Sequence, residues 1–230
     1  MTEFKEKELL YENGLGCSGD ISSWRVEGEA AITFPRGRMR MENAKDRDKE
    51  TGIHGNFILW CNRSFPDHIA VRWDFRPLTD RGLAMIWIAA GGRKGEDLFD
   101  PALAERDGDY PQYHHGDINA LHGSYFRRNP SEIPFRTCNL RKSYGFHMVC
   151  QGADPLPDSA YATGFYRMEV IKSGRHFRFS INNLLIYHWV DDGESYGPVL
   201  EGGKIGFRQM AGLIADYGNL EVWSVEKAKE

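Results

Sequence analysis

The segment FYRMEVIKSGRHFRFSINNLLIYHWV, residues 165–190, contains three short runs in which apolar and polar side chains alternate. Ser173-Gly174 and Asn182-Asn183 separate these runs, and Asn and Gly tolerate the positive φ angles of tight hairpin turns. Alternation with a period of two, broken by such turns, predicts an antiparallel meander. Its three strands are expected at Phe165–Ile171, Arg175–Ile181 and Leu184–Val190. The segment therefore predicts an all-β fold.

The remainder of the chain follows the same pattern. Runs rich in Val, Ile, Phe, Tyr and Trp recur between clusters of Gly, Pro, Asn and Asp, which is typical of a two-sheet antiparallel sandwich. Further strands are predicted at Ala30–Phe34, Arg38–Glu42, Asn56–Cys61, His68–Arg76, Leu83–Ala90, Asp117–Arg128, Phe135–Lys142, Gly145–Cys150, Lys204–Gln209 and Asn219–Val225. Helix is expected only in short pieces, such as one near Pro101–Arg106, because no long stretch has a helical apolar repeat.

Gly91–Gly116 is the longest segment without a predicted strand, and it is rich in Asp, Tyr and His. Loops of this length in compact proteins are usually functional or disordered. Its aromatic content favours an ordered loop lying over a groove.

Length and charge limit the possible classes of protein. A chain of 230 residues is expected to form one domain, residues 1–230. The formal net charge is only −4, which argues against nucleic acid or an anionic membrane as a partner and leaves a homo-oligomer possible. No apolar run approaches the roughly 20 residues that span a bilayer. Because Met1–Tyr11 also lacks the apolar core of a secretory signal, a soluble cytoplasmic protein is expected.

The four cysteines show no CxxC spacing, and three of them lie in apolar runs. Cys17, Cys61, Cys138 and Cys150 are therefore expected to be buried free thiols rather than disulfides or metal ligands.

In a sandwich, each strand directs alternate residues into the core between the sheets, so the apolar set of a run predicts which side chains face outward. In Leu83–Ala90 the better core set is Ala84, Ile86, Ile88 and Ala90, which turns Trp87 outward. In Asp117–Arg128 the more apolar set is Ile118, Ala120, His122, Ser124 and Phe126. In the next two runs the core sets are Cys138 with Leu140, and Phe146, Met148 with Cys150.

The outward residues of these strands form the predicted groove face, if the strands are neighbours. They are Trp87, Asp117, Asn119, Tyr125, Arg127, Asn139, Arg141 and His147, with Arg208 from a later strand. An aromatic plate with planar hydrogen-bonding groups suits a pyranose ring, and several guanidinium groups favour a carboxylate-bearing sugar. An acidic oligosaccharide is the expected ligand. The alternative is that these residues merely form the solvated face of an antiparallel sheet.

Two cleavage chemistries can be weighed against this residue set. Retaining hydrolysis needs two carboxylates about 5 to 5.5 Å apart. No ExDxxE-type run exists, and Glu96-Asp97, Asp100 and Asp117 could supply a pair only through a loop folding over the groove. Elimination instead needs groups that neutralise a uronate carboxylate, and a Tyr or His that moves protons. The sequence favours elimination, with a non-catalytic sugar-binding protein as the alternative.

The predicted roles follow from that preference. The catalytic candidates are Tyr125, His147, Arg141 and Asp117, and the substrate-binding candidates are Trp87, Asn119, Arg127, Asn139 and Arg208. No cofactor is expected. A metal held by His114-His115 with Asp117 is disfavoured, because adjacent side chains of an extended segment point apart. His122 is expected to be a hydrogen-bonded core histidine, and Asp191, Asp192 and Glu194 a solvated turn, with structural calcium as the minority interpretation.

Five segments resemble the bacterial YesU-like proteins. They are GEDLFDPAL (95–103), YPQYHHGDINALHGSYFRR (110–128), FRTCNLRKS (135–143), GADPLPD (152–158) and GPVLEGGKIGFRQM (197–210), within a resemblance that runs from Trp24 to Trp223. This resemblance implies a jelly roll of the concanavalin-A-like lectin/glucanase type. It also implies a role in the use of rhamnogalacturonan, an acidic pectic polysaccharide. It supplies no catalytic residues.

Overall fold

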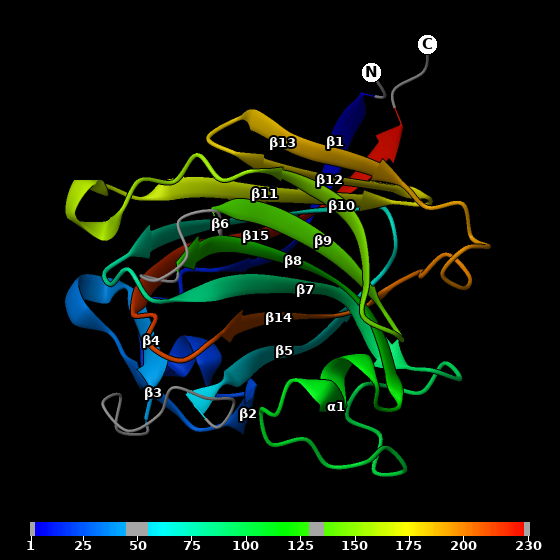
Figure 1. Cartoon of the computed structure of the whole chain (residues 1–230), viewed down its shortest axis with the longest axis horizontal. Coiled ribbons are helices and arrows are strands. Elements are labelled where there is room, and N and C mark those ends of the chain that lie inside the picture. Colours follow the sequence, from blue (N-terminus) through cyan, green and yellow to red (C-terminus); the bar gives the residue numbers. More distant parts are fainter. Residues whose placement is uncertain (1–2, 45–54, 129–135, 228–230) are drawn as a thin grey trace.

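The computed structural model describes residues 3–44, 55–128 and 136–227. Two curved antiparallel sheets pack face to face (Figure 1), which confirms the predicted all-β jelly-roll sandwich. Sheet A has the order β13 (Leu184–Val190), β12 (His176–Ile181), β11 (Tyr166–Ser173), β6 (Ile69–Pro77), β15 (Ala215–Lys227), β4 (Met39–Asn43), β3 (Ala30–Thr33), and β1 (Phe4–Asn13) pairs with β15. Sheet B has the order β10 (His147–Ala153), β9 (Thr137–Ser143), β8 (Ile118–Arg128), β7 (Gly82–Gly92), β14 (Gly203–Gln209), β5 (Phe57–Phe65), β2 (Arg25–Gly28).

The quoted meander forms as predicted. β11 pairs with β12 and β12 with β13, and both connecting turns use left-handed residues. Gly174 has φ 53°, while Asn182 and Asn183 have φ 47° and 66°. Two successive residues with positive φ are typical of a type I′ turn, whose twist matches that of the two strands it joins. Asn tolerates positive φ, which explains why it occupies both positions.

The inter-sheet core is dominated by aromatic side chains. Trp73 and Phe75 of β6 contact Tyr125 of β8, and Phe207 of β14 contacts Trp73. All four are completely buried. Full burial of one large apolar side chain contributes about 1.5 to 3 kcal/mol, so this layer is a main source of stability.

Two strands were not predicted from the sequence. β1 has the charge-rich sequence FKEKELLYEN, most of which is exposed. It forms because β15 offers it a partner edge rather than because of its own apolar pattern. β2 is only four residues long and pairs with β5.

Helix is confined to short pieces, but not at the predicted place. Residues 101–106 form a turn, a bend and irregular chain. The single α-helix of the described residues is α1 (Pro111–His114), with 3-10 turns at Ser18–Ile21, Pro35–Gly37 and Ser159–Tyr161. No helix in the described part of the chain is long and apolar enough to cross a membrane.

The cysteines are all free. Cys61 and Cys138 are buried and Cys150 is partly buried, whereas Cys17 is exposed, so the predicted burial was wrong for Cys17. Its segment lies in a surface 3-10 turn rather than in a strand. The predicted strand at Phe135–Lys142 corresponds to β9, and Phe135 itself lies outside the described residues.

Candidate functional site

Residues 93–117 join β7 to β8 and include α1, at the lower right of Figure 1. Leu98 and Tyr113 of this loop pack on Trp60 and Trp87 on the outer face of sheet B, so the loop covers part of that face, as its aromatic content predicted. The loop is anchored by Arg106, whose guanidinium donates to both carboxylate oxygens of Glu27 at 3.1 and 2.9 Å. Glu27 also accepts a hydrogen bond from Trp60 Nε1 at 2.9 Å. Arg106 and Glu27 are both buried, so the loop is fixed to β2 and β5 by a desolvated ion pair.

Strand register places two transverse rows of side chains on this outer face. One row comprises Trp60, Gly206, Trp87, His122, Arg141 and Met148, and the other comprises Ile58, Arg208, Met85, Ser124, Asn139 and Gln151. The members on β5, β14 and β7 are buried beneath the loop, apart from Gly206, which has no side chain. Toward β9 and β10 the face opens, and Arg141, Met148 and Gln151 are accessible. We call this accessible part, over β8 to β10, the open groove.

Trp87 faces outward from the inter-sheet core, as predicted, but it is 0% exposed. Its indole stacks on the His122 ring at 4.1 Å and 6°. Tyr113 and Trp60 make edge contacts with it at 5.8 and 6.0 Å. Trp87 is therefore the centre of a second apolar cluster under the loop, and no sugar can stack on it in this conformation.

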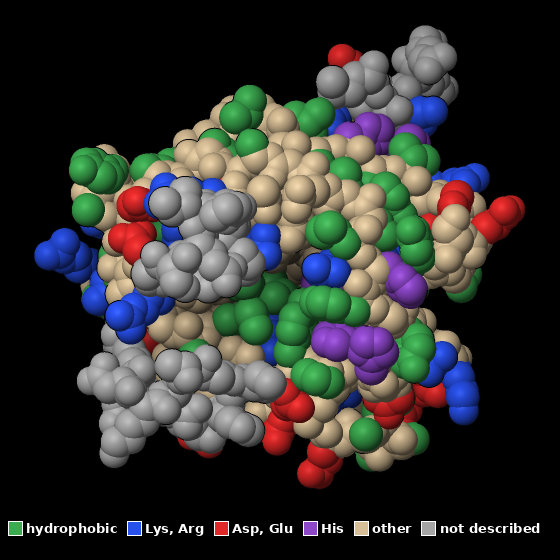
Figure 2. Space-filling model, viewed as in Figure 1, with side chains coloured by type: hydrophobic (Ala, Val, Ile, Leu, Met, Phe, Trp, Pro, Cys, Tyr) green, Lys and Arg blue, Asp and Glu red, His purple; other side chains and the backbone are tan. Residues whose placement is uncertain are grey.

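An aromatic cluster lines the open groove where α1 meets the β9–β10 turn. Tyr110 lies edge-on to Phe146 at 5.4 Å and to His114 at 4.8 Å. Arg141 Cζ lies 3.8 Å from the Phe146 ring centroid, and its Nη1 donates to Phe146 O at 2.9 Å. Phe146 is 39% exposed, so it offers apolar surface to a ligand. Figure 2 shows hydrophobic and histidine side chains gathered with Lys or Arg atoms around a hollow in this face.

The charges of three guanidinium groups act on the Tyr110 phenol. Burial raises the pKa of Tyr110 to about 12, and the positive charges of Arg208, Arg141 and Arg127 oppose that rise. Arg208 is 0% exposed, and its Cζ lies 4.8 Å from the Tyr110 ring centroid and 4.7 Å from that of Tyr113. Its Nη2 donates to Gly108 O at 2.7 Å, while its Nε and Nη1 have no partner.

His122 lies directly below Tyr110. Its Nδ1 is 3.4 Å from Tyr110 Oη, and its Nε2 is 3.2 Å from Ser143 Oγ. Burial first, then the charges of Arg141, His114 and Arg208, hold the pKa of His122 well below its usual value. Burial likewise lowers the pKa of His114 to about 4, with His115 and the same two arginines adding to the effect. Both rings are therefore neutral at pH 7.

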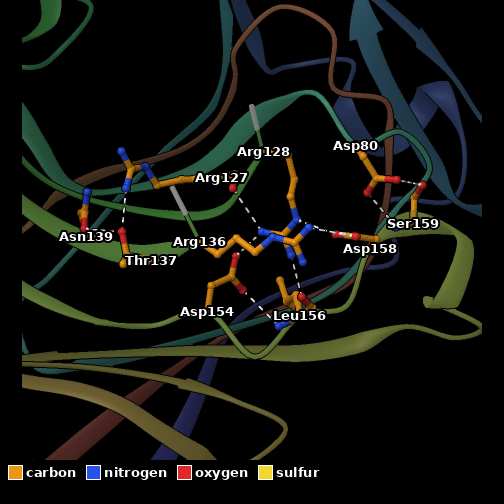
Figure 3. A network of polar contacts seen from close by, with 10 residues as sticks. All are labelled: Asp80, Arg127, Arg128, Arg136, Thr137, Asn139, Asp154, Leu156, Asp158 and Ser159. Atoms are coloured by element: carbon orange, nitrogen blue, oxygen red, sulfur yellow. Dashed lines mark hydrogen bonds and ion pairs between the residues drawn. The ribbon is translucent and has the colours of Figure 1, made fainter. Parts of the chain in front are cut away.

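Arg127 and Arg128 are consecutive in the sequence, but their side chains have different partners (Figure 3). Arg127 Nη1 donates to Thr137 Oγ1 at 2.7 Å, beside the Asn139 amide, in the open groove. Arg128 instead pairs with Asp154 at 2.8 Å and Asp158 at 3.1 Å. Arg127 therefore borders the open groove, whereas Arg128 is held in a buried ion-pair network.

Trp87 and Arg208 lie on the predicted face but are buried beneath the loop, and four further predicted site residues are not placed as expected. Tyr125 is buried in the inter-sheet core against Trp73 and Phe75, so its predicted groove position was wrong. The parity of β8 is reversed before Phe126: Leu121 faces the inter-sheet core, while His122 stacks on Trp87 outside it. Phe126 itself adopts φ 45° and packs in the core beside Tyr125, which returns Arg127 to the groove side.

His147 packs against Tyr196 at 4.7 Å, away from the aromatic cluster. The apolar parity of its strand was assigned wrongly for Phe146 and Met148, which face outward. It was correct for Cys150, which packs against the inter-sheet core beyond a register shift after Met148. Asp117 Oδ2 accepts from Ala104 N at 2.7 Å, and Asn119 Oδ1 accepts from Tyr144 N at 3.1 Å. Asp117 therefore holds backbone of the 93–117 loop, and Asn119 holds backbone of the β9–β10 turn. Asn119 also borders a cavity of about 500 Å³ lined by Gly91, Glu96 and Gly203.

The remaining acidic candidates are engaged in turns. Asp97 pairs with Lys204, while Glu96 and Asp100 accept backbone N–H groups of their own loop. Asp191 is buried against Lys142 at 2.7 Å, so the predicted solvated turn was wrong for Asp191. It holds for Asp192, which accepts from Ser195 N, and for Glu194, since both are exposed. Across residues 3–44, 55–128 and 136–227, no group of three or more His, Cys, Asp or Glu side chains is placed to hold a metal ion.

Sequence reasoning placed Arg127, Asn139, Arg141 and Arg208 on the correct face, although Arg208 lies beneath the loop. It missed Tyr110, His114, Phe146 and Gln151 as groove residues. The aromatic loop composition was the available signal for Tyr110 and His114. Nothing in the sequence marked Phe146, because an apolar residue in an alternating run is indistinguishable from core.

Comparison with known proteins shows which family the chain resembles. The family described as "Domain of unknown function (DUF1961)" matches residues 8–222. The chain belongs to the DUF1961 family. YesU of Bacillus subtilis (strain 168) is 50% identical to this DUF1961 chain over 220 residues, covering 95% of this chain and 97% of YesU. The resemblance to YesU-like proteins is thereby confirmed.

Solved structures agree on the fold of this DUF1961 member. A Bacillus subtilis protein of unknown function with a galectin-like fold has a TM-score of 0.93 and 48% identity, covering 98% of this chain and 100% of its own. The endo-β-1,3-glucanase of Pyrococcus furiosus has a TM-score of 0.61 at 8% identity, covering 96% of this chain and 95% of its own. The second likeness concerns the fold alone.

Proposed function

We propose that the open groove of sheet B binds a short acidic oligosaccharide and cleaves it by β-elimination. The observation that carries this proposal is that two partly exposed guanidinium groups, Arg127 and Arg141, border the open groove close enough to Tyr110 for their charges to act on its phenol, with the buried Arg208 adding its charge from beneath. Guanidinium groups match a carboxylate with two parallel hydrogen bonds. A uronate carboxylate placed there would be neutralised, which is the requirement for removing the proton next to it.

The aromatic and amide groups of the groove favour a sugar over other kinds of carboxylate-bearing ligand. Phe146 supplies an exposed ring for the apolar face of a pyranose. The exposed Gln151, whose side-chain amide donates to the buried Asn139 at 2.8 Å, supplies a planar donor and acceptor for hydroxyls. The YesU-like resemblance adds a source for such a ligand, the acidic pectic polysaccharide rhamnogalacturonan.

Hydrolysis fits the described residues less well. A retaining hydrolase needs two carboxylates about 5 to 5.5 Å apart across the scissile bond. Three acidic residues of the 93–117 loop, Glu96, Asp97 and Asp100, are occupied in turns and an ion pair rather than directed into the open groove. The galectin-like fold of the 48% identical structure keeps a non-catalytic sugar-binding protein as the second candidate. Incubation with rhamnogalacturonan oligosaccharides separates the candidates, because only elimination creates absorbance near ~235 nm.

Arg141→Met should reveal the charge of the ligand. The variant is expected to lose at least about tenfold more affinity for a uronate oligosaccharide than for its carboxyl-reduced counterpart, because it removes one charge-assisted contact worth about 1.5 to 3 kcal/mol. Isothermal titration with both ligands measures the difference. Added salt should weaken only the uronate ligand. Equal losses for the two ligands would contradict a carboxylate contact.

Ligand length should matter only up to a few sugar residues. The open groove spans β8 to β10, about 4.8 Å per strand, before the loop buries the face over β7 and β14. Affinity is therefore expected to rise from one to about three sugar residues and to change less than about twofold beyond that length. Titration with a graded series of oligogalacturonides tests this. A continued rise up to polymer would mean that the loop opens or that the ligand runs elsewhere.

A further inference from the structure

We infer that Tyr110 is the acid–base group of the elimination and that His122 is the positioning residue that takes up its proton. This inference rests on the proposed function and assigns a role to two residues of the same groove. Its geometric basis is a continuous line of three polar groups: Tyr110 Oη, the His122 ring and Ser143 Oγ, joined at 3.4 and 3.2 Å. The line runs from the groove surface into the buried layer beneath.

The burial of each member fits its place in that line. His122 is 1% exposed and cannot touch a sugar, whereas Tyr110 is only partly buried and borders the exposed Phe146. Ser143 accepts from Nε2–H in one tautomer of the neutral imidazole, which leaves Nδ1 free to accept from Tyr110. Stacking on Trp87 at 4.1 Å and 6° fixes the plane of the His122 ring. A histidine with a purely structural role would also need a hydrogen-bond partner on each ring nitrogen. It would not need one of those partners to be a groove residue such as Tyr110.

The step balances without a co-reactant. The uronate C5–H bond breaks, its proton passes to Tyr110 Oη, and the phenolic proton of Tyr110 moves to His122 Nδ1. The electron pair of the C5–H bond forms the C4=C5 double bond as the C4–O bond breaks. The leaving oxygen takes a proton back from Tyr110, which recovers its own from His122. Both residues end as they began.

The surrounding charges make this relay depend on the substrate. Arg141 from β9, Arg208 from β14 and His114 from α1 disfavour a protonated His122, in addition to burial. Tyr110 from the loop, Ser143 from β9 and Trp87 from β7 are the neutral groups against the ring. A bound carboxylate offsets the arginine charges, which makes imidazolium easier to form. His122 therefore gains basicity when a uronate occupies the groove.

Tyr110→Phe tests the assignment. We expect the rate of absorbance increase near ~235 nm to fall by at least about 100-fold, the lower end of general acid–base effects, because the phenol is removed and the ring retained. The dissociation constant of the uronate oligosaccharide should stay within about threefold, because the phenol adds little to binding. Tyr144→Phe is the matched control: this tyrosine is 40% exposed beside Arg93, and its variant should retain the wild-type rate.

His122→Gln tests the positioning role by a pH profile. A protonated His122 cannot accept from Tyr110, so wild-type kcat should fall as the pH drops through the pKa of His122 in the complex. The glutamine variant should lose that acidic limb together with most of kcat, at unchanged KM. An unchanged pH profile, or a Tyr110→Phe rate within threefold of wild type, would overturn the assignment and leave the proposed function standing. A wild-type protein that binds no uronate oligosaccharide would overturn the proposed function itself.

Discussion

Trp87→Ala is expected to lower the free energy of unfolding by about 3 to 5 kcal/mol, the usual range for removing a fully buried aromatic ring. The side chain is 0% exposed, stacks on His122 and contacts Trp60 and Tyr113, so its loss leaves a cavity under the loop. Urea unfolding measures the effect as a lower midpoint at constant slope.

Met148→Ala is the matched control for this substitution. Met148 lies in the same transverse row but is 49% exposed, so its truncation should change stability by less than about 0.5 kcal/mol. If Trp87→Ala cost under about 1 kcal/mol and instead weakened sugar binding, the indole would be a ligand platform, as alternation in the sequence had predicted. That result would mean that the 93–117 loop lifts away from it in solution.

Arg128→Met should be comparably destabilising, by about 3 to 5 kcal/mol, because it breaks a buried ion pair from one side. Arg128 bridges Asp154 and Asp158 and also donates to Leu156 O at 2.6 Å (Figure 3). The Asp154 side chain is 0% exposed, so the variant leaves its carboxylate buried and without this counter-charge. Thermal or urea unfolding gives the loss directly.

Arg136→Met provides the comparison at the same carboxylate. Arg136 pairs with Asp158 at 2.9 Å, but its side chain is 49% exposed, and such surface pairs contribute about 0 to 1 kcal/mol. A small effect at Arg136 beside a large one at Arg128 would show that burial, rather than the number of ion pairs, decides the cost. Similar losses for the two variants would contradict that view.

The strands could be predicted from the sequence, but the faces of some strands could not. Alternation of apolar and polar residues locates a strand wherever one face of the strand is apolar. It located all three strands of the meander and every strand of sheet B except β2. Alternation shows which face of the strand packs in the core only if the opposite face is exposed to solvent. On β8 the loop covers the outer face, so Ile118 and Ala120 are buried there just as Leu121 is buried inside. Apolar composition could not distinguish the two sides.

Irregular backbone also shifts the alternation along β7 and β8. Ala89 on β7 and Phe126 on β8 have φ 54° and 45°, and a bulge at such a residue shifts the alternation beyond it. Arg127 was placed on the correct face only because one such shift cancelled the reversed parity of the preceding residues. On β9, where both edges are paired and no bulge intervenes with β8, the predicted outward Asn139 and Arg141 agree with the structure.

The Glu27–Arg106 ion pair connects the 93–117 loop to β2, which is distant from the loop in the sequence. A circular permutant or fusion that detaches β2 would remove Glu27 and leave the buried Arg106 guanidinium without its counter-charge, which favours release of the loop from Trp60. Protein engineering on this scaffold should therefore treat β2 and the 93–117 loop as one inseparable module. New junctions belong instead in the exposed β12–β13 turn, where Asn182 and Asn183 face solvent.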